Sequence, residues 1–186
     1  MGLPSKEEQV LELFFNEPTK QWHFEDILKA SKTSRSKANK WLAKLAKEGI
    51  IRHVKPQGKM PYFQGYFDSP AYRSRKRLFA LSQLQKSGLI DRLISLPKAK
   101  TVIIFGSMTR SDWYKDSDID IFIYGTDEEL DIYPYRKLLN REIQVFTATN
   151  PAELDKMGPA LLRNILEGML IKGKIDFIKV MPIATV

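Results

Sequence analysis

Apolar residues recur at helical spacing in the first part of the chain and then give way to two short alternating runs. The helical stretches each place their apolar side chains on one face, and a short break separates the second stretch from the third. The alternating runs flank a turn that contains Pro56 and Gly58, as expected for a β-hairpin. Helices are therefore predicted at residues 6–16, 23–30 and 34–48, and strands at residues 50–54 and 60–66.

The pattern changes again after the hairpin. Residues 68–98 are predicted to be helical, because Ser69 and Pro70 form a favourable helix start and Gly88 interrupts the segment. From residue 101 onward, runs rich in β-branched residues alternate with amphipathic stretches. Strands are predicted at residues 101–105, 118–124, 143–147 and 175–180, and helices at residues 108–113, 127–139 and 151–170.

The composition fits a folded, soluble protein without a membrane segment. Of the 186 residues, 43% are hydrophobic and 28% are charged, as is ordinary for globular proteins. No apolar run approaches the roughly 20 residues that a membrane span needs, and the start of the chain lacks a signal pattern. Cysteine is absent, which excludes disulfides and thiolate zinc sites. We expect a cytoplasmic protein with no membrane partner.

Charge is distributed unevenly along the chain. Residues 1–98 contain 19 Lys and Arg against 9 Asp and Glu, whereas residues 99–186 contain 11 against 13. The front part therefore suits a polyanion such as nucleic acid, and the back part gathers carboxylates. The basic run from Arg73 to Arg77 has two interpretations, either phosphate contacts or the solvated face of a connecting helix.

The most informative stretch is residues 105–124, FGSMTRSDWYKDSDIDIFIY. Gly106 and Ser107 follow a predicted strand, so backbone amides and a hydroxyl can approach a phosphate closely. Asp118 and Asp120 stand two apart on the next predicted strand and project side by side. Paired carboxylates of this kind hold Mg²⁺ or Mn²⁺ beside a triphosphate. The alternative is a turn followed by an ordinary amphipathic strand, although aspartate is depleted in strands.

This stretch resembles the nucleotidyltransferase signature of the DNA polymerase beta superfamily, and it is most similar to the minimal nucleotidyltransferases of archaea and bacteria. The family pattern Gly-Ser-x-x-Arg is matched by Gly106, Ser107 and Arg110, and Asp-Ser-Asp-Ile-Asp is matched by residues 116–120. The resemblance covers residues 98–175 and implies a mixed sheet flanked by helices. It also implies that Gly106 and Ser107 bind the triphosphate, that Arg110 assists, and that Asp118 and Asp120 bind metal.

The family usually places a third carboxylate on a following strand, and here the sequence departs from it. The matching stretch, REIQVFT, puts Gln144 in that position, and an amide is a weak metal ligand and no base. Glu142 lies two residues earlier, on the same face of the predicted strand. Two alternatives remain: either Glu142 completes the catalytic set with Asp118 and Asp120, or the third carboxylate is lost and catalysis is impaired.

The three helices and the hairpin resemble a winged helix-turn-helix domain over residues 5–67, in their order and in the phrase WLAKLAKEGIIRHV. The resemblance implies that the third helix enters a major groove and that the hairpin tip reaches the backbone or the minor groove. Such domains also serve as dimer or protein-binding modules, which remains the alternative. The residues expected at nucleic acid are Ser34, Arg35, Lys37, Asn39 and Lys40 of the helix, and Lys55 and Lys59 of the hairpin.

Together these observations predict an α+β protein with a winged helix domain at 1–67, a helical connector at 68–98 and a nucleotidyltransferase domain at 99–186. We expect NMP transfer from an NTP, with ATP as the expected nucleotide, to a hydroxyl of a protein, an RNA or a small molecule. Minimal nucleotidyltransferases often act as antitoxins that modify a partner toxin. DNA or RNA is the expected partner of the winged helix, and a homodimer is a further option. The alternative is a DNA-binding transcriptional regulator whose transferase domain is degenerate or senses a nucleotide.

Overall fold

The computed structural model describes residues 5–177, and the chain divides into two compact units. The first unit contains the chain up to Lys86 together with Ser111–Ser117. The second unit contains Ser87–Arg110 and the chain from Asp118 onward. No helix within residues 5–177 combines the length and the apolarity that a membrane span requires.

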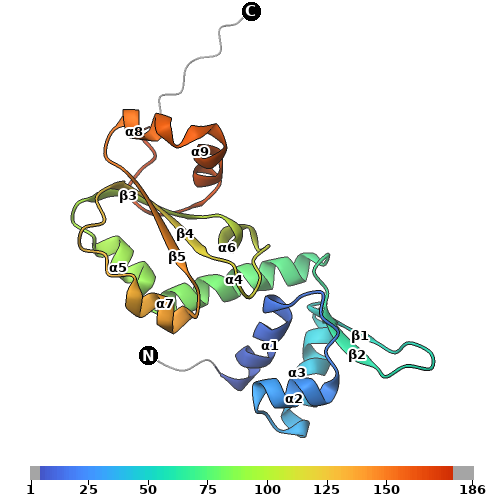
Figure 1. Ribbon diagram of the computed structural model, residues 1–186. Coiled ribbons are helices and arrows are strands. Elements are labelled where there is room, and N and C mark those ends of the chain that lie inside the picture. The colour runs from blue at the N-terminus through green and yellow to red at the C-terminus, as the bar shows by residue number, and fades with distance from the viewer. Residues whose placement is uncertain (1–4, 178–186) are drawn as a thin grey trace, which may run out of the picture. The chain divides into compact units, whose positions relative to one another are not determined.

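The first unit is built from helices and one β-hairpin, in the order that the sequence pattern predicts (Figure 1). The hairpin strands pair antiparallel, from Ile51 opposite Gly65 to Val54 opposite Tyr62. Ser34 occupies the N-cap position of the third helix, as predicted, although its side chain makes no capping hydrogen bond. The elements are α1 (Lys6–Asn16), α2 (Phe24–Ser31), α3 (Arg35–Lys47), β1 (Ile51–Val54), β2 (Tyr62–Gly65) and α4 (Pro70–Lys86).

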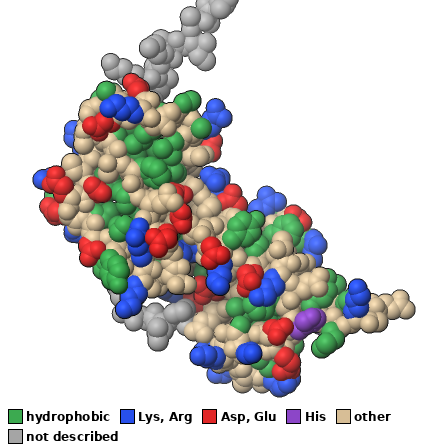
Figure 2. Space-filling model, viewed as in Figure 1, with side chains coloured by type: hydrophobic (Ala, Val, Ile, Leu, Met, Phe, Trp, Pro, Cys, Tyr) green, Lys and Arg blue, Asp and Glu red, His purple; other side chains and the backbone are tan. Residues whose placement is uncertain are grey.

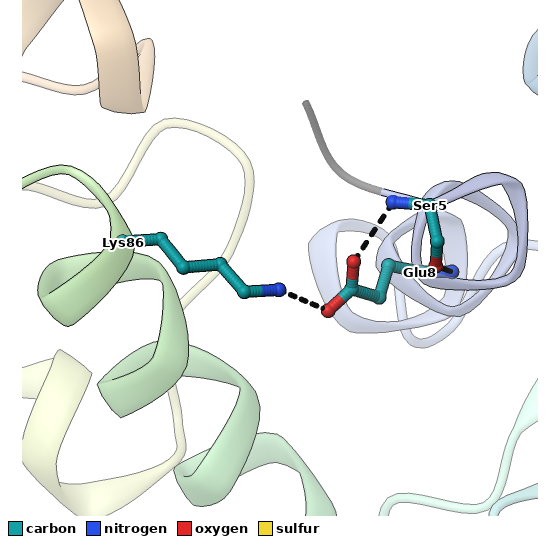
Figure 3. A network of polar contacts seen from close by, with 3 residues as sticks. All are labelled: Ser5, Glu8 and Lys86. Atoms are coloured by element: carbon teal, nitrogen blue, oxygen red, sulfur yellow. Dashed lines mark hydrogen bonds and ion pairs between the residues drawn. The ribbon is translucent and has the colours of Figure 1, made fainter. Parts of the chain in front are cut away.

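The start of α1 is held by a reciprocal cap that also reaches the end of α4 (Figure 3). The Ser5 hydroxyl accepts from the backbone N–H of Glu8 at 3.2 Å, and the Glu8 carboxylate accepts from the backbone N–H of Ser5 at 2.8 Å. The other carboxylate oxygen of Glu8 accepts from the Lys86 ammonium at 2.6 Å. The hydrogen bonds from Lys86 and Ser5 lower the pKa of Glu8, with that from Lys86 contributing most.

The second unit is a four-stranded mixed sheet with helices, which agrees with the predicted class of fold. The strand order is β5-β4-β3-β6; β3 runs antiparallel to β4 and β6, and β4 runs parallel to β5. The elements are α5 (Leu89–Ser95), β3 (Ala99–Phe105), α6 (Ser107–Arg110), β4 (Ile119–Gly125), α7 (Tyr133–Leu139), β5 (Ile143–Ala148), α8 (Pro151–Lys156), α9 (Gly158–Leu166) and β6 (Met169–Lys172).

Both faces of the central strands are covered, which explains why these strands are so apolar. On one face, Phe122 of β4 packs in a cluster with Leu154 of α8 and Ile165 of α9, and Figure 1 shows these two helices on one side of the sheet. The opposite face of β4 carries Ile121 and the isoleucines two positions before and after it, and all three are fully buried as well. Polar side chains of β4 reach solvent only near the first and last residues of this strand.

Four of the elements predicted after residue 98 are wrong in extent or position. The predicted helix 108–113 corresponds to α6, which ends at Arg110. The predicted helix 151–170 is divided at Gly158, whose backbone takes a positive φ of 76°, and Pro159 follows. The predicted helix 127–139 begins only at Tyr133. The edge strand is β6 rather than residues 175–180, of which 175–177 are not in a strand and 178–180 lie outside the described residues.

Gly168 explains why the chain turns into a strand where a helix was predicted. A Cβ at this position would lie 2.6 Å from the Cγ2 atom of Ile103 and 2.7 Å from the carbonyl oxygen of Ile104. Only a residue without a side chain allows the backbone to approach β3 so closely. The apolar residues that follow Gly168 then pair along β3 instead of continuing α9.

Candidate nucleotide and metal site

The candidate site begins where β3 ends. Phe105, its last residue, lies opposite Asp120 of β4 in the antiparallel register. Gly106 then turns the chain with a φ of 76°, a conformation that favours glycine. Its carbonyl oxygen accepts from the backbone N–H and the hydroxyl of Thr109, at 3.3 and 2.9 Å, which closes the single turn α6. The turn thus places Ser107 and Arg110 beside the start of β4.

The Gly106 turn lies directly against the Asp120 carboxylate. A Cβ built on Gly106 would stand 2.2 Å from the Oδ2 atom of Asp120, so any side chain there displaces that carboxylate. The sequence separates these two residues by fourteen positions, and the pairing of β3 with β4 brings them together. Two parts of the predicted site are therefore in contact.

Asp118 and Asp120 interact electrostatically, as their alternation along the chain predicts. Burial raises the pKa of the Asp120 carboxyl above its ordinary value, the charge of Asp118 raises it further, and the guanidinium of Arg110 opposes both. All three residues were predicted for this site. An unfavourable pair of carboxylates beside a cationic side chain is a place where an added cation relieves repulsion.

Gln144, rather than Glu142, lies at the carboxylate pair. In the parallel pairing of β4 with β5, Gln144 is the register partner of Asp120, and its side-chain amide donates to the Oδ2 atom of Asp118. Glu142 precedes the first residue of β5, and its carboxylate forms an ion pair with Arg136 at 3.2 Å. Its side chain is 67% exposed. The alternative in which Glu142 completes the set is therefore not the arrangement that the structure adopts.

The residues present fit a divalent cation that is shared with phosphate. Asp118 and Asp120 supply hard oxygen ligands, which suit Mg²⁺ or Mn²⁺. Within residues 5–177, however, no three His, Cys, Asp or Glu side chains gather into a group that could hold a metal ion alone. Mg²⁺ is commonly bound by one or two carboxylates together with substrate phosphates, and this donor set matches that mode.

The residues predicted to bind nucleic acid all lie on the surface of the first unit. Those of α3 and of the hairpin are exposed, but Arg35 forms an ion pair with Glu25 at 2.6 Å. Figure 2 shows that Lys and Arg side chains are interspersed with Asp and Glu on the visible face. The exposed set is Ser34, Arg35, Lys37, Asn39, Lys40, Lys55 and Lys59.

The basic run of α4 contains a residue that sequence reasoning misplaced. Arg73, Arg75 and Arg77 are exposed, but Lys76 is buried and touches Trp113 of the segment between α6 and β4. Neither interpretation of the run, phosphate contact or solvated face, applies to Lys76. A usable signal was its position four residues after Tyr72 on the apolar face of the helix.

A comparison with protein families agrees with this geometry. Residues 88–175, slightly less than half of the chain, match the family model described as Polymerase beta, Nucleotidyltransferase. The match supports the polymerase beta superfamily for this part of the chain, and nucleotidyl transfer as its class of activity. No curated protein and no solved structure matches the chain significantly.

Proposed function

We propose that the second unit binds a nucleoside triphosphate, with ATP as the expected one, together with Mg²⁺ or Mn²⁺, and transfers the nucleoside monophosphate to a hydroxyl group. The observation that carries this proposal is the contact between the Gly106 turn and Asp120, with Asp118 beside them. A turn of this kind suits phosphate and a carboxylate pair suits a cation, and the pairing of Phe105 with Asp120 near the start of β4 supports a role for both in one site.

The chain's own residues would share the work as follows. The backbone N–H groups after Gly106 and the Ser107 hydroxyl donate to the phosphates, and Arg110 adds positive charge. Asp118 and Asp120 hold the cation, which when bound neutralises charge on the phosphates and on the departing pyrophosphate. The acceptor oxygen forms the new bond to the α-phosphorus, the bond from that phosphorus to pyrophosphate breaks, and the acceptor proton leaves to a base.

The identity of that base divides two versions of the proposal. Glu142 serves as the base only if its carboxylate leaves Arg136, whereas Gln144 has no basic group. The acceptor belongs to a protein, an RNA end or a small molecule. An acceptor of low pKa would need no base from the chain.

A second candidate function is a nucleic-acid-binding regulator whose second unit senses a nucleotide without turnover. The specific observation in its favour is the amide of Gln144 at the carboxylate pair. The order of helices and hairpin in the first unit supports a winged helix-turn-helix, with α3 in the major groove and the hairpin at the backbone. The exposed cations Lys37, Lys40, Lys55 and Lys59 would meet phosphates.

A labelled-nucleotide assay separates the two functions. Wild-type protein is incubated with α-labelled ATP, Mg²⁺ or Mn²⁺ and candidate acceptors, beside the double variant Asp118→Asn/Asp120→Asn and the control Asp131→Asn. The transferase proposal expects label on an acceptor, a loss on the order of 10²–10³-fold in the double variant, and none in the control. Nucleotide binding without transfer to any acceptor would favour the sensor, and absence of both would refute the nucleotide site.

A further inference from the structure

Lys76 is a lysine in the core of the first unit. It is 2% exposed, and it occupies the apolar face of α4 between Tyr72 and Phe79. Burying an ammonium group is costly unless its charge and its donors are compensated. Its Nζ atom donates to the backbone carbonyl of Trp113 at 2.6 Å and lies 4.5 Å from the centroid of the Trp113 ring. Lys76 therefore binds Trp113 through both its main chain and its indole.

Trp113 belongs to Ser111–Ser117, the segment of the first unit that comes from later in the chain. Its side chain is 1% exposed and stacks on Phe79 with 6.3 Å between ring centroids. Two residues further on, the backbone N–H of Lys115 donates to the carbonyl of Asn16 in α1 at 3.0 Å. The segment is thus held to α4 and to α1, two helices of the first unit.

The same segment joins the two stretches that carry the proposed nucleotide site. Arg110, the last residue of α6, precedes it directly, and Asp118 follows it directly. Seven residues separate these two, and the second half of the segment is held as a turn by its own hydrogen bonds. The backbone N–H of Tyr114 donates to the Ser117 hydroxyl at 2.8 Å, and the backbone N–H of Ser117 donates to the Tyr114 carbonyl at 3.2 Å. We therefore expect a shift of Trp113 to be passed through the backbone to Arg110 on one side and to Asp118 on the other.

We infer that Lys76 is a positioning residue for the nucleotide site: by holding Trp113 it fixes the segment that sets Arg110 and Asp118. This inference rests on the proposed function, because it concerns the same site. It adds that the site depends on the first unit through the side chain of Lys76, whether or not α3 binds nucleic acid. The part of the chain that matches the transferase family is then incomplete without α4.

The anchoring is tested by hydrogen exchange on the full-length chain. Lys76→Met removes the ammonium but keeps a long side chain, and Arg77→Met makes the same change at an exposed position of α4. We expect exchange of the amides in residues 111–117 to rise about tenfold or more in Lys76→Met, because a buried carbonyl loses its donor. Amides of α3 should keep wild-type protection, and Arg77→Met should match wild type. Unchanged protection of residues 111–117 would overturn the inference.

The positioning role is tested by nucleotide binding to the same proteins. Calorimetric titration with ATP and Mn²⁺ should show affinity weakened severalfold in Lys76→Met and restored, at least in part, in Lys76→Arg. In the transfer assay the KM for ATP should rise more than kcat falls, a split that a general loss of stability does not produce. Faster exchange with unchanged affinity would overturn the positioning role while leaving the proposed function intact.

Two further outcomes keep the test decisive. If Lys76→Met does not fold, Trp113→Phe leaves Lys76 in place and only makes smaller the aromatic ring that Lys76 and Phe79 contact. The same rise in exchange and the same weakening of ATP affinity are then expected in milder form, and their absence would overturn the inference. If wild-type protein binds no ATP, it is the proposed function that fails, and the inference fails with it.

Discussion

The turn at Gly106 and the carboxylate of Asp120 fit together so closely that a Cβ on Gly106 would lie 2.2 Å from the Oδ2 atom of Asp120. The other atoms of Asp120 stand further off, with Cγ at 3.2 Å from the same point. The displaced group would therefore be the carboxylate end of the side chain and not the backbone of β4. The contact constrains the geometry of the site more than the stability of the fold.

The first prediction concerns Gly106→Ala, with Gly158→Ala as a matched control. Both glycines have a φ of 76°, but nothing lies within 4 Å of a Cβ at Gly158. Both variants should lose roughly 1–2 kcal/mol of unfolding free energy, because alanine is strained at positive φ. Only Gly106→Ala should lose transfer activity, by about 10²-fold, because its Cβ moves a carboxylate by an ångström or more. Urea denaturation and the labelled-ATP assay measure the two effects, and equal activity of both variants would contradict the contact.

The second prediction concerns Gln144→Glu, which places a third carboxylate at Asp118. Without divalent cations this variant should be less stable than wild type, because a third negative charge joins two others. With Mg²⁺ it should bind the cation more tightly, and transfer should rise by about 10²-fold if the missing group is a base. Thermal unfolding with and without Mg²⁺, followed by the transfer assay, checks both parts. A variant with lower Mg²⁺ affinity than wild type would contradict the position assigned to Gln144.

The third prediction concerns Glu142→Gln, which separates the two versions of the site. In the structure Glu142 pairs with Arg136 at the surface, and exposed ion pairs contribute little to stability. We therefore expect transfer activity within about twofold of wild type, since a surface change of this kind is usually small. A loss of about 10²-fold or more would instead show that Glu142 leaves Arg136 and acts as the base.

The fourth prediction is a pH dependence of stability that comes from Asp120. Burial and Asp118 raise the pKa of Asp120 in the folded protein, so the folded state holds this proton more tightly than the unfolded chain. The stability contributed by the protonated form is present below the unfolded pKa and is lost as pH rises through the folded pKa. Asp120→Asn removes this loss, so without divalent cations its melting temperature should exceed that of wild type at pH 7.

The difference between Asp120→Asn and wild type should shrink as pH falls below the ordinary aspartate pKa of about 3.9, because there Asp120 is largely protonated in both states. Calorimetry across this pH range measures it, and Mg²⁺ at neutral pH should raise the melting temperature of wild type more than that of the variant. A wild-type protein that is more stable than Asp120→Asn at pH 7 without cations would contradict the assignment of Asp120 to a site of repulsion.

The fifth prediction concerns nucleic-acid binding by α3. The triple variant Arg35→Ala/Lys37→Ala/Lys40→Ala should bind duplex DNA more weakly. The slope of log K against log salt concentration should be less steep by about 2–3, because each lost phosphate contact reduces the slope by about 0.9. The control Lys137→Ala/Lys156→Ala/Arg163→Ala removes the same charge from exposed positions of the second unit and should change the slope little. Equal slopes for both variants would mean that α3 is not the contact surface.

Local patterns in the sequence were sufficient to predict the helices and strands whose formation depends on residues close together in the chain. The helical spacing of residues 6–16 and the strand-like run at 101–105 predicted elements that the structure contains, at nearly the same bounds. The pair Asp118 and Asp120 was also readable, because side chains two apart in a strand share a face whatever the strand pairs with. Gly106 could likewise be identified as a turn, because glycine after a strand favours one through its own backbone freedom, and its φ in the structure is 76°.

Tertiary structure decided what depends on residues far apart in the chain. Whether Gln144 or Glu142 meets Asp118 follows from the register of β4 with β5, and whether residues 169–172 form a strand follows from the contact of Gly168 with β3. The burial of Lys76 needs Trp113, which is 37 positions away. Hydrogen bonds and side-chain periodicity within one element depend on a few adjacent residues, whereas register and burial depend on packing between elements, and only the folded chain brings those partners together.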